Sequence, residues 1–226
     1  QLISFLIYKK NKIESPINII NIGGISNVTQ VSKFEDLNYL NIKALDIGPG
    51  NCLIDEWIRK KTNKSFDENG EIAKSGKAND LILNQAIDNF SITKYGKSLD
   101  IKDFDISFVK GLSLEDGCAT LTKFSAYLIV NGIEYINKSN DNFPKINLVC
   151  GGGRKNLSLI KDINFFLPYK DVNLENIDIL GYDGDFIESQ CFGYLAIRSY
   201  LNLPISFPST TGCKEPTIGG VINKNF

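Results

Sequence analysis

The sequence predicts a mixed α/β fold in which an antiparallel hairpin comes first and β–α crossovers follow. Two β-rich runs flank the Gly23-Gly24 dipeptide in residues 17–31, a pattern typical of a hairpin. Further along, strand-like apolar runs alternate with amphipathic helical patterns, which indicates a sheet covered by helices. With 226 residues, the chain is long enough to bury one sizeable core.

Each expected element has its own signal in the sequence. Residues 1–16 resemble the tail of a preceding segment, because Pro16 interrupts the chain just before the first regular pattern. Residues 66–113 are patterned more weakly and are interpreted as an insertion. The expected elements, in order, are the hairpin at 17–31, a strand at 42–47, a helix after Gly48-Pro49-Gly50, a helix near 78–90 inside the insertion, a long helix at 115–137, a strand at 146–150, a helix from Asn156, a strand at 177–180 and a helix at 185–201. The ribonuclease-H-like fold has this order of elements.

The charge balance limits the classes of partner. Lys and Arg number 25 and Asp and Glu number 26, which leaves a net charge of −1. A nucleic-acid or anionic-membrane partner normally requires a basic excess, so neither is expected. The sequence also contains no apolar run that approaches the roughly 18 residues needed to span a bilayer.

Two residue types are absent from the composition. The lack of histidine excludes Ser-His-Asp and Cys-His catalytic arrangements and most zinc sites, so no metal held by protein ligands is expected. The chain has no methionine and begins at Gln1, so we expect it to be either a processed protein or part of a longer chain. Of these two alternatives, the longer chain is preferred. Its five cysteines are an odd number without a C-x-x-C pair, which favours reduced thiols and a cytoplasmic location.

Three glycine turns stand where predicted strands end: Gly23-Gly24, Gly48-Pro49-Gly50 and Gly151-Gly152-Gly153. Glycine allows the backbone to approach a phosphate closely, and the helices after the second and third turns present free N–H groups to an anion. The alternative is that each turn only reverses the chain. Polar residues follow the turns, namely Ser26 and Asn27, then Asn51, then Arg154 and Asn156. Together the turns are interpreted as a nucleotide site.

The run VCGGGRKN at 149–156 has a weaker alternative interpretation. It follows a strand, opens a helix and precedes Asp171 by about 20 residues, as in dinucleotide-binding folds. However, it lacks the third glycine of G-x-G-x-x-G, and the hairpin at the start of the domain argues against an NAD-dependent oxidoreductase.

Eight motifs in order resemble one known family. They are NIGGISNVT (21–29), LDIGPGNCLIDEWI (45–58), FDENGEIAKSGK (66–77), KSLDIKDFD (97–105), DGCATLT (116–122), CGGGRKN (150–156), GDFIES (184–189) and PSTTG (208–212). Their order and spacing over essentially the whole chain resemble the anhydro-N-acetylmuramic acid kinases, within the superfamily of sugar kinases, heat-shock proteins and actin-like ATPases.

This resemblance implies an enzyme of cell-wall recycling that uses ATP with Mg²⁺. The enzyme opens the anhydro ring of its sugar with water and phosphorylates it to N-acetylmuramic acid 6-phosphate. The resemblance also implies two ribonuclease-H-like lobes around a nucleotide cleft, and relatives suggest a homodimer. The family's Gly-Thr-Ser-x-Asp-Gly phosphate loop and its water-activating Asp do not occur in this sequence. Residues 17–226 are therefore expected to be the second lobe, inactive without a missing N-terminal lobe that supplies the catalytic base.

The resemblance assigns nucleotide contacts to two of the turns. Gly23, Gly24, Ser26 and Asn27 correspond to the hairpin that contacts the terminal phosphates. Gly151, Gly152 and Gly153 correspond to the adenosine motif, with Asn156 capping the adjacent helix.

Three further residues are candidates for substrate contacts. Asp46 and Asn51 are expected near a metal-bound phosphate or a sugar hydroxyl, but Asp46 is equally well explained by an Asx-type turn and Asn51 by a helix N-cap. Glu188 aligns with the family's Gly-Asp-x-x-Glu motif and is expected to contact the sugar. Its alternative is a capping box in which Asp185 is the N-cap. Lys97 and Ser98 are weaker candidates. A different class of function remains open, namely a stand-alone nucleotide-binding regulatory module without catalysis.

Overall fold

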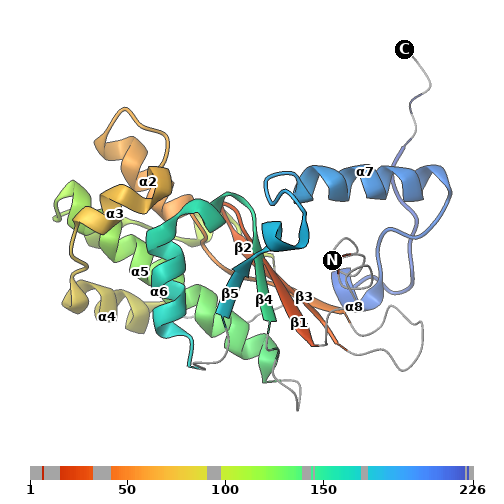
Figure 1. Ribbon diagram of the computed structural model, residues 1–226, viewed down its shortest axis with the longest axis horizontal. Helices are drawn as coiled ribbons and strands as arrows, with labels where there is room; N and C mark the ends of the chain where they lie inside the picture. The colour runs from red at the N-terminus through yellow and green to blue at the C-terminus, as the bar shows by residue number, and fades with distance from the viewer. Residues whose placement is uncertain are drawn as a thin grey trace.

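A computed structural model describes residues 7, 16–32, 42–90, 98–138, 144, 146–168, 173–221 and 223. Its centre is one sheet of five strands in the order β3-β2-β1-β4-β5 (Figure 1). The strands are β1 (Ile17–Ile22), β2 (Ser26–Val31), β3 (Ile42–Gly48), β4 (Ile146–Cys150) and β5 (Asn173–Asn176). β2 pairs antiparallel with both β1 and β3, whereas β1, β4 and β5 pair in parallel. This arrangement confirms the predicted mixed, ribonuclease-H-like fold.

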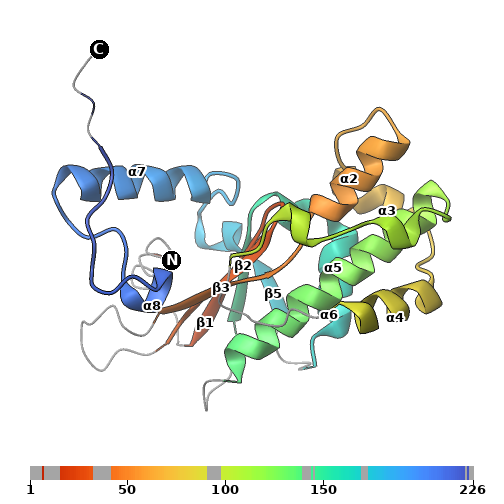
Figure 2. The same cartoon turned by 180° about the vertical axis from the view of Figure 1, so that it is seen from behind.

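Helices cover both faces of the sheet. The longer ones are α2 (Cys52–Lys61), α4 (Asp80–Asn89), α5 (Leu114–Asn137), α6 (Leu157–Phe166) and α7 (Ile187–Tyr200), and the shorter ones are α3 (Glu71–Ser75) and α8 (Pro208–Thr211). Helices α5 and α6 pack against one face, and α7 and α8 lie on the opposite side, as the front and back views show (Figures 1 and 2). No helix in the described ranges is long and apolar enough to cross a membrane.

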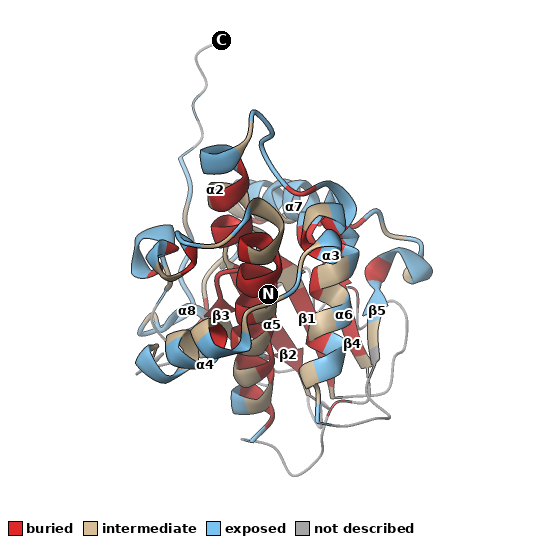
Figure 3. Ribbon diagram, turned by 90° about the vertical axis from the view of Figure 1, so that its left-hand side faces the viewer, coloured by how far each residue is buried: buried red, intermediate tan, exposed pale blue. Residues whose placement is uncertain are grey.

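The core forms on both sides of the sheet, where most of the strand residues are buried (Figure 3). On the α5 and α6 side, residues such as Ile20, Ile47 and Ile133 pack together. On the other side, Ile17, Ile19 and Leu148 pack with Ile177 and Ile187. Because a strand exposes alternate residues to opposite faces, β1 contributes to both layers.

The region predicted as an insertion packs tightly on the helices around it. Trp57 of α2 is fully buried, and its indole N–H donates to the carbonyl of Leu114 at 2.9 Å. The same apolar cluster includes Ala73, Leu83 and Phe104 from residues 66–113. The helix predicted near 78–90 is α4. Helix α3 and the short 3-10 helices at Glu68–Gly70, Ile101–Asp103 and Ser107–Val109 were not predicted individually.

Two predicted elements differ from the structure. The strand predicted at 177–180 is wrong, because the strand is β5 and Ile177–Leu180 is a 3-10 helix. This helix begins where the side chain of Asn176 accepts a hydrogen bond from the N–H of Asp178. The helix predicted at 185–201 begins at Ile187 instead, since the residues before it form a turn.

Candidate functional site

The three glycine turns lie at the same edge of the sheet. Strands β1, β3 and β4 run in the same direction, so their carboxyl ends meet there. The N–H of Asn51 donates to the carbonyl of Gly23 at 2.9 Å, and the N–H of Cys52 donates to that of Gly24 at 3.1 Å. Gly50 has a φ of 51°, and a Cβ there would lie only 2.9 Å from the carbonyl oxygen of Gly24. The first two turns are thus held against each other, and α2 begins beside the hairpin.

The third turn contains glycines with different structural roles. Gly151 has a φ of 81°, and a Cβ on it would collide with Oδ1 of Asn21. A Cβ on Gly153 would collide with the side chain of Ile22. By contrast, a Cβ on Gly152 would meet nothing within 4 Å, and this residue is exposed. The fold therefore requires Gly151 and Gly153, whereas Gly152 leaves open space at the surface of the turn.

A pocket of about 260 Å³ joins the first and third turns to the start of α7. Of the predicted site residues, it brings together five: Gly23, Asn27, Gly151, Gly152 and Glu188. Its other lining residues are Ile19, Asn21, Thr29, Cys150, Gly184, Asp185, Ile187 and Cys191. We call it the turn pocket.

A second pocket of about 580 Å³ adjoins the turn pocket at Gly152, which lines both. It extends toward α2 and includes two further predicted residues, Asn51 and Asn156, beside Lys155. The rest of its lining is Asp55, Arg59, Ser65, Phe66, Asp67, Glu68 and Asn69. We call it the α2 pocket. Another pocket of about 460 Å³, lined by residues of α3, α5 and α6, contains none of the predicted site residues.

The two asparagines predicted as helix caps behave differently. Oδ1 of Asn156 accepts a hydrogen bond from the N–H of Leu159 at 3.0 Å, so this residue caps α6 as predicted. Asn51 occupies the N-cap position of α2, but its side chain makes no capping hydrogen bond. The capping explanation of the Asn51 side chain is therefore wrong, and this side chain lines the α2 pocket.

Three other candidates, Asp46, Ser26 and Ser98, line neither the turn pocket nor the α2 pocket. Oδ2 of Asp46 accepts a hydrogen bond from the N–H of Leu99 at 2.8 Å, which attaches residues 98–100 to β3. Ser26 is fully buried behind the hairpin turn, and its Oγ has no hydrogen-bond partner among the described residues. Lys97 lies outside the described residues.

Glu188 is in the first turn of α7 and lines the turn pocket. The predicted capping box is wrong, because α7 has Phe186 at its N-cap and no side-chain capping bond. The carboxylate of Asp185 instead pairs with Arg154 at 2.5 Å and with Lys155. The hydrogen bonds from Arg154 and then Lys155 lower the pKa of Asp185 to about 2.

Sequence reasoning missed the role of Arg154. Its side chain is only 4% exposed and lies near three carboxylates, those of Asp178, Asp183 and Asp185. The hydrogen bond to Asp185 raises the pKa of the guanidinium above its usual range. The sequence signal that could have identified this role is the cluster of three aspartates within residues 178–185. Their negative charges favour a nearby cationic side chain.

The described side chains of these pockets form no metal-binding cluster, and the Cys150 thiol is not activated. Within the described ranges, no group of three or more His, Cys, Asp or Glu residues is placed to hold a metal ion. Cys150 lines the turn pocket, but burial raises the pKa of its thiol to about 12. Since the thiolate is the nucleophile, this thiol is not activated at neutral pH.

Fold and pockets together define a ribonuclease-H-like α/β protein with a candidate ligand site at the carboxyl ends of β1 and β4. The model of the family described as anhydro-N-acetylmuramic acid kinase matches residues 5–225, and the chain belongs to this family. An anhydro-N-acetylmuramic acid kinase of Pelagibacter ubique (strain HTCC1062) is 53% identical, with 98% of this chain and 58% of that protein covered. The enzyme of the same name from Zymomonas mobilis subsp. mobilis is 37% identical, with 92% of this chain and 54% of that protein covered. The chain thus spans little more than half the length of these curated relatives.

Proposed function

We propose that this chain is the nucleotide-binding second lobe of an anhydro-N-acetylmuramic acid kinase. The proposed reaction uses ATP and water to open the anhydro ring and yields N-acetylmuramic acid 6-phosphate. The observation that supports this most directly is the turn pocket, which Glu188 lines together with Gly23 and Gly151 in a chain of this family. A phosphate site and a carboxylate that can accept hydrogen bonds from sugar hydroxyls would then share one cavity.

The proposed nucleotide extends along both pockets past Gly152. The phosphate oxygens would accept hydrogen bonds from backbone N–H groups of the glycine turns. The N-terminal ends of α2 and α6 would also favour the negative charge of the phosphates. Phosphoryl transfer depends mainly on positioning and charge neutralisation, so backbone donors suit the task. The lack of a described metal cluster is compatible with Mg²⁺ that arrives on the phosphates, because Mg²⁺ commonly uses substrate phosphates and only one or two carboxylates.

The lobe assignment rests on the shared length. The alignment covers 58% of the Pelagibacter relative and 54% of the Zymomonas relative, which leaves ample length for a first lobe in those proteins. We propose that the residue that activates water belongs to that lobe. The 226-residue chain by itself would then bind nucleotide without turning it over.

Gly152→Val tests the nucleotide site, because a Cβ at Gly152 would meet nothing within 4 Å and this residue lines both pockets. The matched control is Gly111→Val, since a Cβ there also meets nothing within 4 Å and Gly111 lines neither pocket. Calorimetric titration with ADP or a non-hydrolysable ATP analogue should show affinity reduced by about tenfold or more for Gly152→Val only, a cost of about 1.4 kcal/mol or more. Equal affinity in both variants would overturn this nucleotide site.

The catalytic proposal is tested in the natural full-length protein. Phosphorylation of the anhydro sugar should depend on the full-length chain and should fall when Glu188 is changed to Gln. Nucleotide binding with no phosphorylation of the sugar would instead support the regulatory module. Binding of NAD in competition with ATP would favour the oxidoreductase.

A further inference from the structure

We propose that Arg154 is a positioning residue that acts through Glu188. In this proposal, Arg154 and its three aspartates fix the segment 178–188 against the Gly151 turn, and so hold Glu188 in the turn pocket. The inference rests on the proposed function of Glu188 as a sugar contact, but the fixing of the segment can be measured without any ligand.

The geometry joins the two walls of the pocket. Nη1 of Arg154 donates to Oδ1 of Asp185 at 2.5 Å and to the carbonyl of Gly151 at 3.1 Å. The N–H of Gly151 in turn donates to the carbonyl of Gly184 at 3.2 Å. Since Asp185 is three residues before Glu188, these contacts determine where α7 begins relative to the glycine turn.

A second set of contacts closes the segment on itself. Oδ1 of Asp178 accepts a hydrogen bond from the N–H of Gly184 at 2.8 Å, and its Oδ2 lies 3.5 Å from Nη2 of Arg154. The carboxylate of Asp183 lies 3.7 Å from the same nitrogen. One guanidinium therefore faces both ends of the 178–185 turn.

The site suits arginine specifically. The planar guanidinium offers several N–H groups in fixed directions, whereas a lysine presents one point charge. Gly184 makes room for it, because a Cβ there would lie 2.5 Å from Nε of Arg154. By contrast, the side chain of Lys155, which also pairs with Asp185, is 56% exposed and contacts only that carboxylate among the three.

Hydrogen exchange in the ligand-free chain tests the fixing of the segment. Arg154→Lys should speed exchange of the amides of residues 184–186 by about tenfold, while the amides of β1 and β4 keep their protection. Asp178→Asn keeps an oxygen that can accept from Gly184 and serves as a milder second variant if Arg154→Lys does not fold. The matched control is Arg198→Lys, a buried arginine of α7 that lines neither pocket and bonds to Pro204 and Tyr194. Unchanged exchange in residues 184–186 for the folded variants would overturn the proposal.

A double-mutant cycle in the full-length protein tests the action through Glu188. Arg154→Lys should lower kcat/KM for the sugar by roughly tenfold in the native background, and should have little further effect in the Glu188→Gln background. A merely structural role would give the same loss in both backgrounds, and that additivity would overturn the inference. If Glu188→Gln alone leaves kcat/KM unchanged, the proposed function of Glu188 fails, and the exchange result still shows whether Arg154 holds the segment.

Discussion

The carboxylate of Asp46, on β3, accepts a hydrogen bond from the N–H of Leu99 at 2.8 Å, across 53 positions of sequence. In the sheet, Asp46 is paired with Asn27, which lines the turn pocket. This bond therefore holds residues 98–100 to a strand that is directly adjacent to the candidate site. Asp46 thus has a structural role, which is separate from the ligand contact expected from the sequence.

Two substitutions at Asp46 separate these tasks. Asp46→Ala should lower the free energy of unfolding by about 1–2 kcal/mol, because it leaves the N–H of Leu99 without its acceptor. Asp46→Asn keeps an acceptor oxygen, so its free energy of unfolding, measured by urea denaturation, should stay close to that of the unchanged chain. If Asp46 also contacts a metal-bound phosphate, Asp46→Asn should weaken nucleotide binding in the presence of Mg²⁺ although it changes stability only slightly. Equal destabilisation by both variants would contradict the role of this hydrogen bond.

Asp55, in the α2 pocket, makes stability depend on pH. Burial raises its pKa from 3.8 to about 6, against the opposing effect of Arg59 and with a further contribution from Asp67. The folded chain thus retains the carboxyl proton more strongly than the unfolded chain does. The carboxyl ionises near pH 4 in the unfolded chain and near pH 6 in the folded chain, so the loss of stability grows between these two pH values and is nearly complete above about pH 6.

Asp55→Asn should therefore stabilise the ligand-free chain at neutral pH only. The expected gain in the free energy of unfolding is about 1 kcal/mol near pH 7.5, reduced for partial solvent exposure, and about zero near pH 4. Urea denaturation at the two pH values measures it. The same gain at both values would show that ionisation of Asp55 is not the cause.

A buried amide network links three strands to the end of α5. Nδ2 of Asn18 donates to Oδ1 of Asn147 at 2.8 Å and to Oδ1 of Asn137 at 3.2 Å, while Gln30 donates to Oδ1 of Asn18 at 3.1 Å. Asn18→Ala should lower the free energy of unfolding by about 2–3 kcal/mol, because it leaves buried amide groups without partners. The control Asn84→Ala, on the exposed side of α4, should change it by less than about 0.5 kcal/mol. Denaturant unfolding measures both variants. Similar losses of unfolding free energy for Asn18→Ala and Asn84→Ala would contradict a stabilising role of the network.

The sequence predicted those parts of the fold that depend on regular periodicity. The hairpin, β3, α2, α5, β4 and α6 have apolar patterns that local reasoning detects, and the structure confirms them. The segment 173–180 was misread because its apolar residues lie in the 3-10 helix, where Ile177 is buried, whereas the strand β5 is short and polar at the sheet edge. Edge position depends on the tertiary fold and has no local pattern.

The candidate site was predictable in part. The motifs located the glycine turns, but only the three-dimensional packing distinguishes the three glycines of the third turn. A Cβ on Gly152 would meet nothing within 4 Å, whereas the fold requires glycine at 151 and 153. The capping box at Asp185 had a plausible local pattern, and a tertiary ion pair with Arg154 replaces it. Long-range charge pairing of this kind decides the start of α7 and cannot be derived from spacing along the chain.

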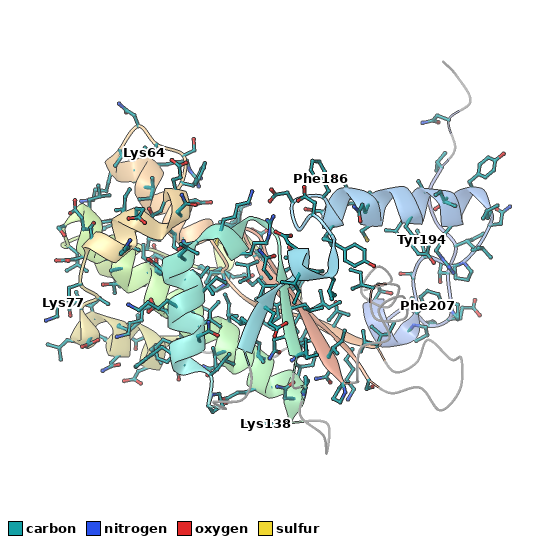
Figure 4. The ribbon with its side chains drawn as sticks, viewed as in Figure 1. Lys64, Lys77, Lys138, Phe186, Tyr194 and Phe207 are labelled. Atoms are coloured by element: carbon teal, nitrogen blue, oxygen red, sulfur yellow. The ribbon has the colours of Figure 1, made fainter. Side chains whose placement is uncertain are left out.

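Helix α7 exposes an unusual amount of apolar surface. In this helix only Ile187 and Arg198 are buried, whereas Phe192, Ile197 and Tyr200 are each more than half exposed. Phe186 at its N-cap is 56% exposed and projects outward from the start of the helix (Figure 4). Such a surface is typical of an interface, so we expect it to drive association of the 226-residue chain when this is purified alone.

Sedimentation velocity over a range of concentrations measures this association. The double variant Ile197→Ser and Leu201→Ser, one helical turn apart, should weaken it by at least about tenfold, because burying each side chain contributes about 1.5–3 kcal/mol. The control Leu81→Ser removes a still more exposed apolar residue from α4, since Leu81 is 84% exposed, and should leave the association unchanged. A chain that stays monomeric at all concentrations would contradict an interface on α7. If the α7 double variant and the α4 control weaken association equally, the association is general apolar aggregation. A specific interface on α7 would be weakened by the α7 substitutions only.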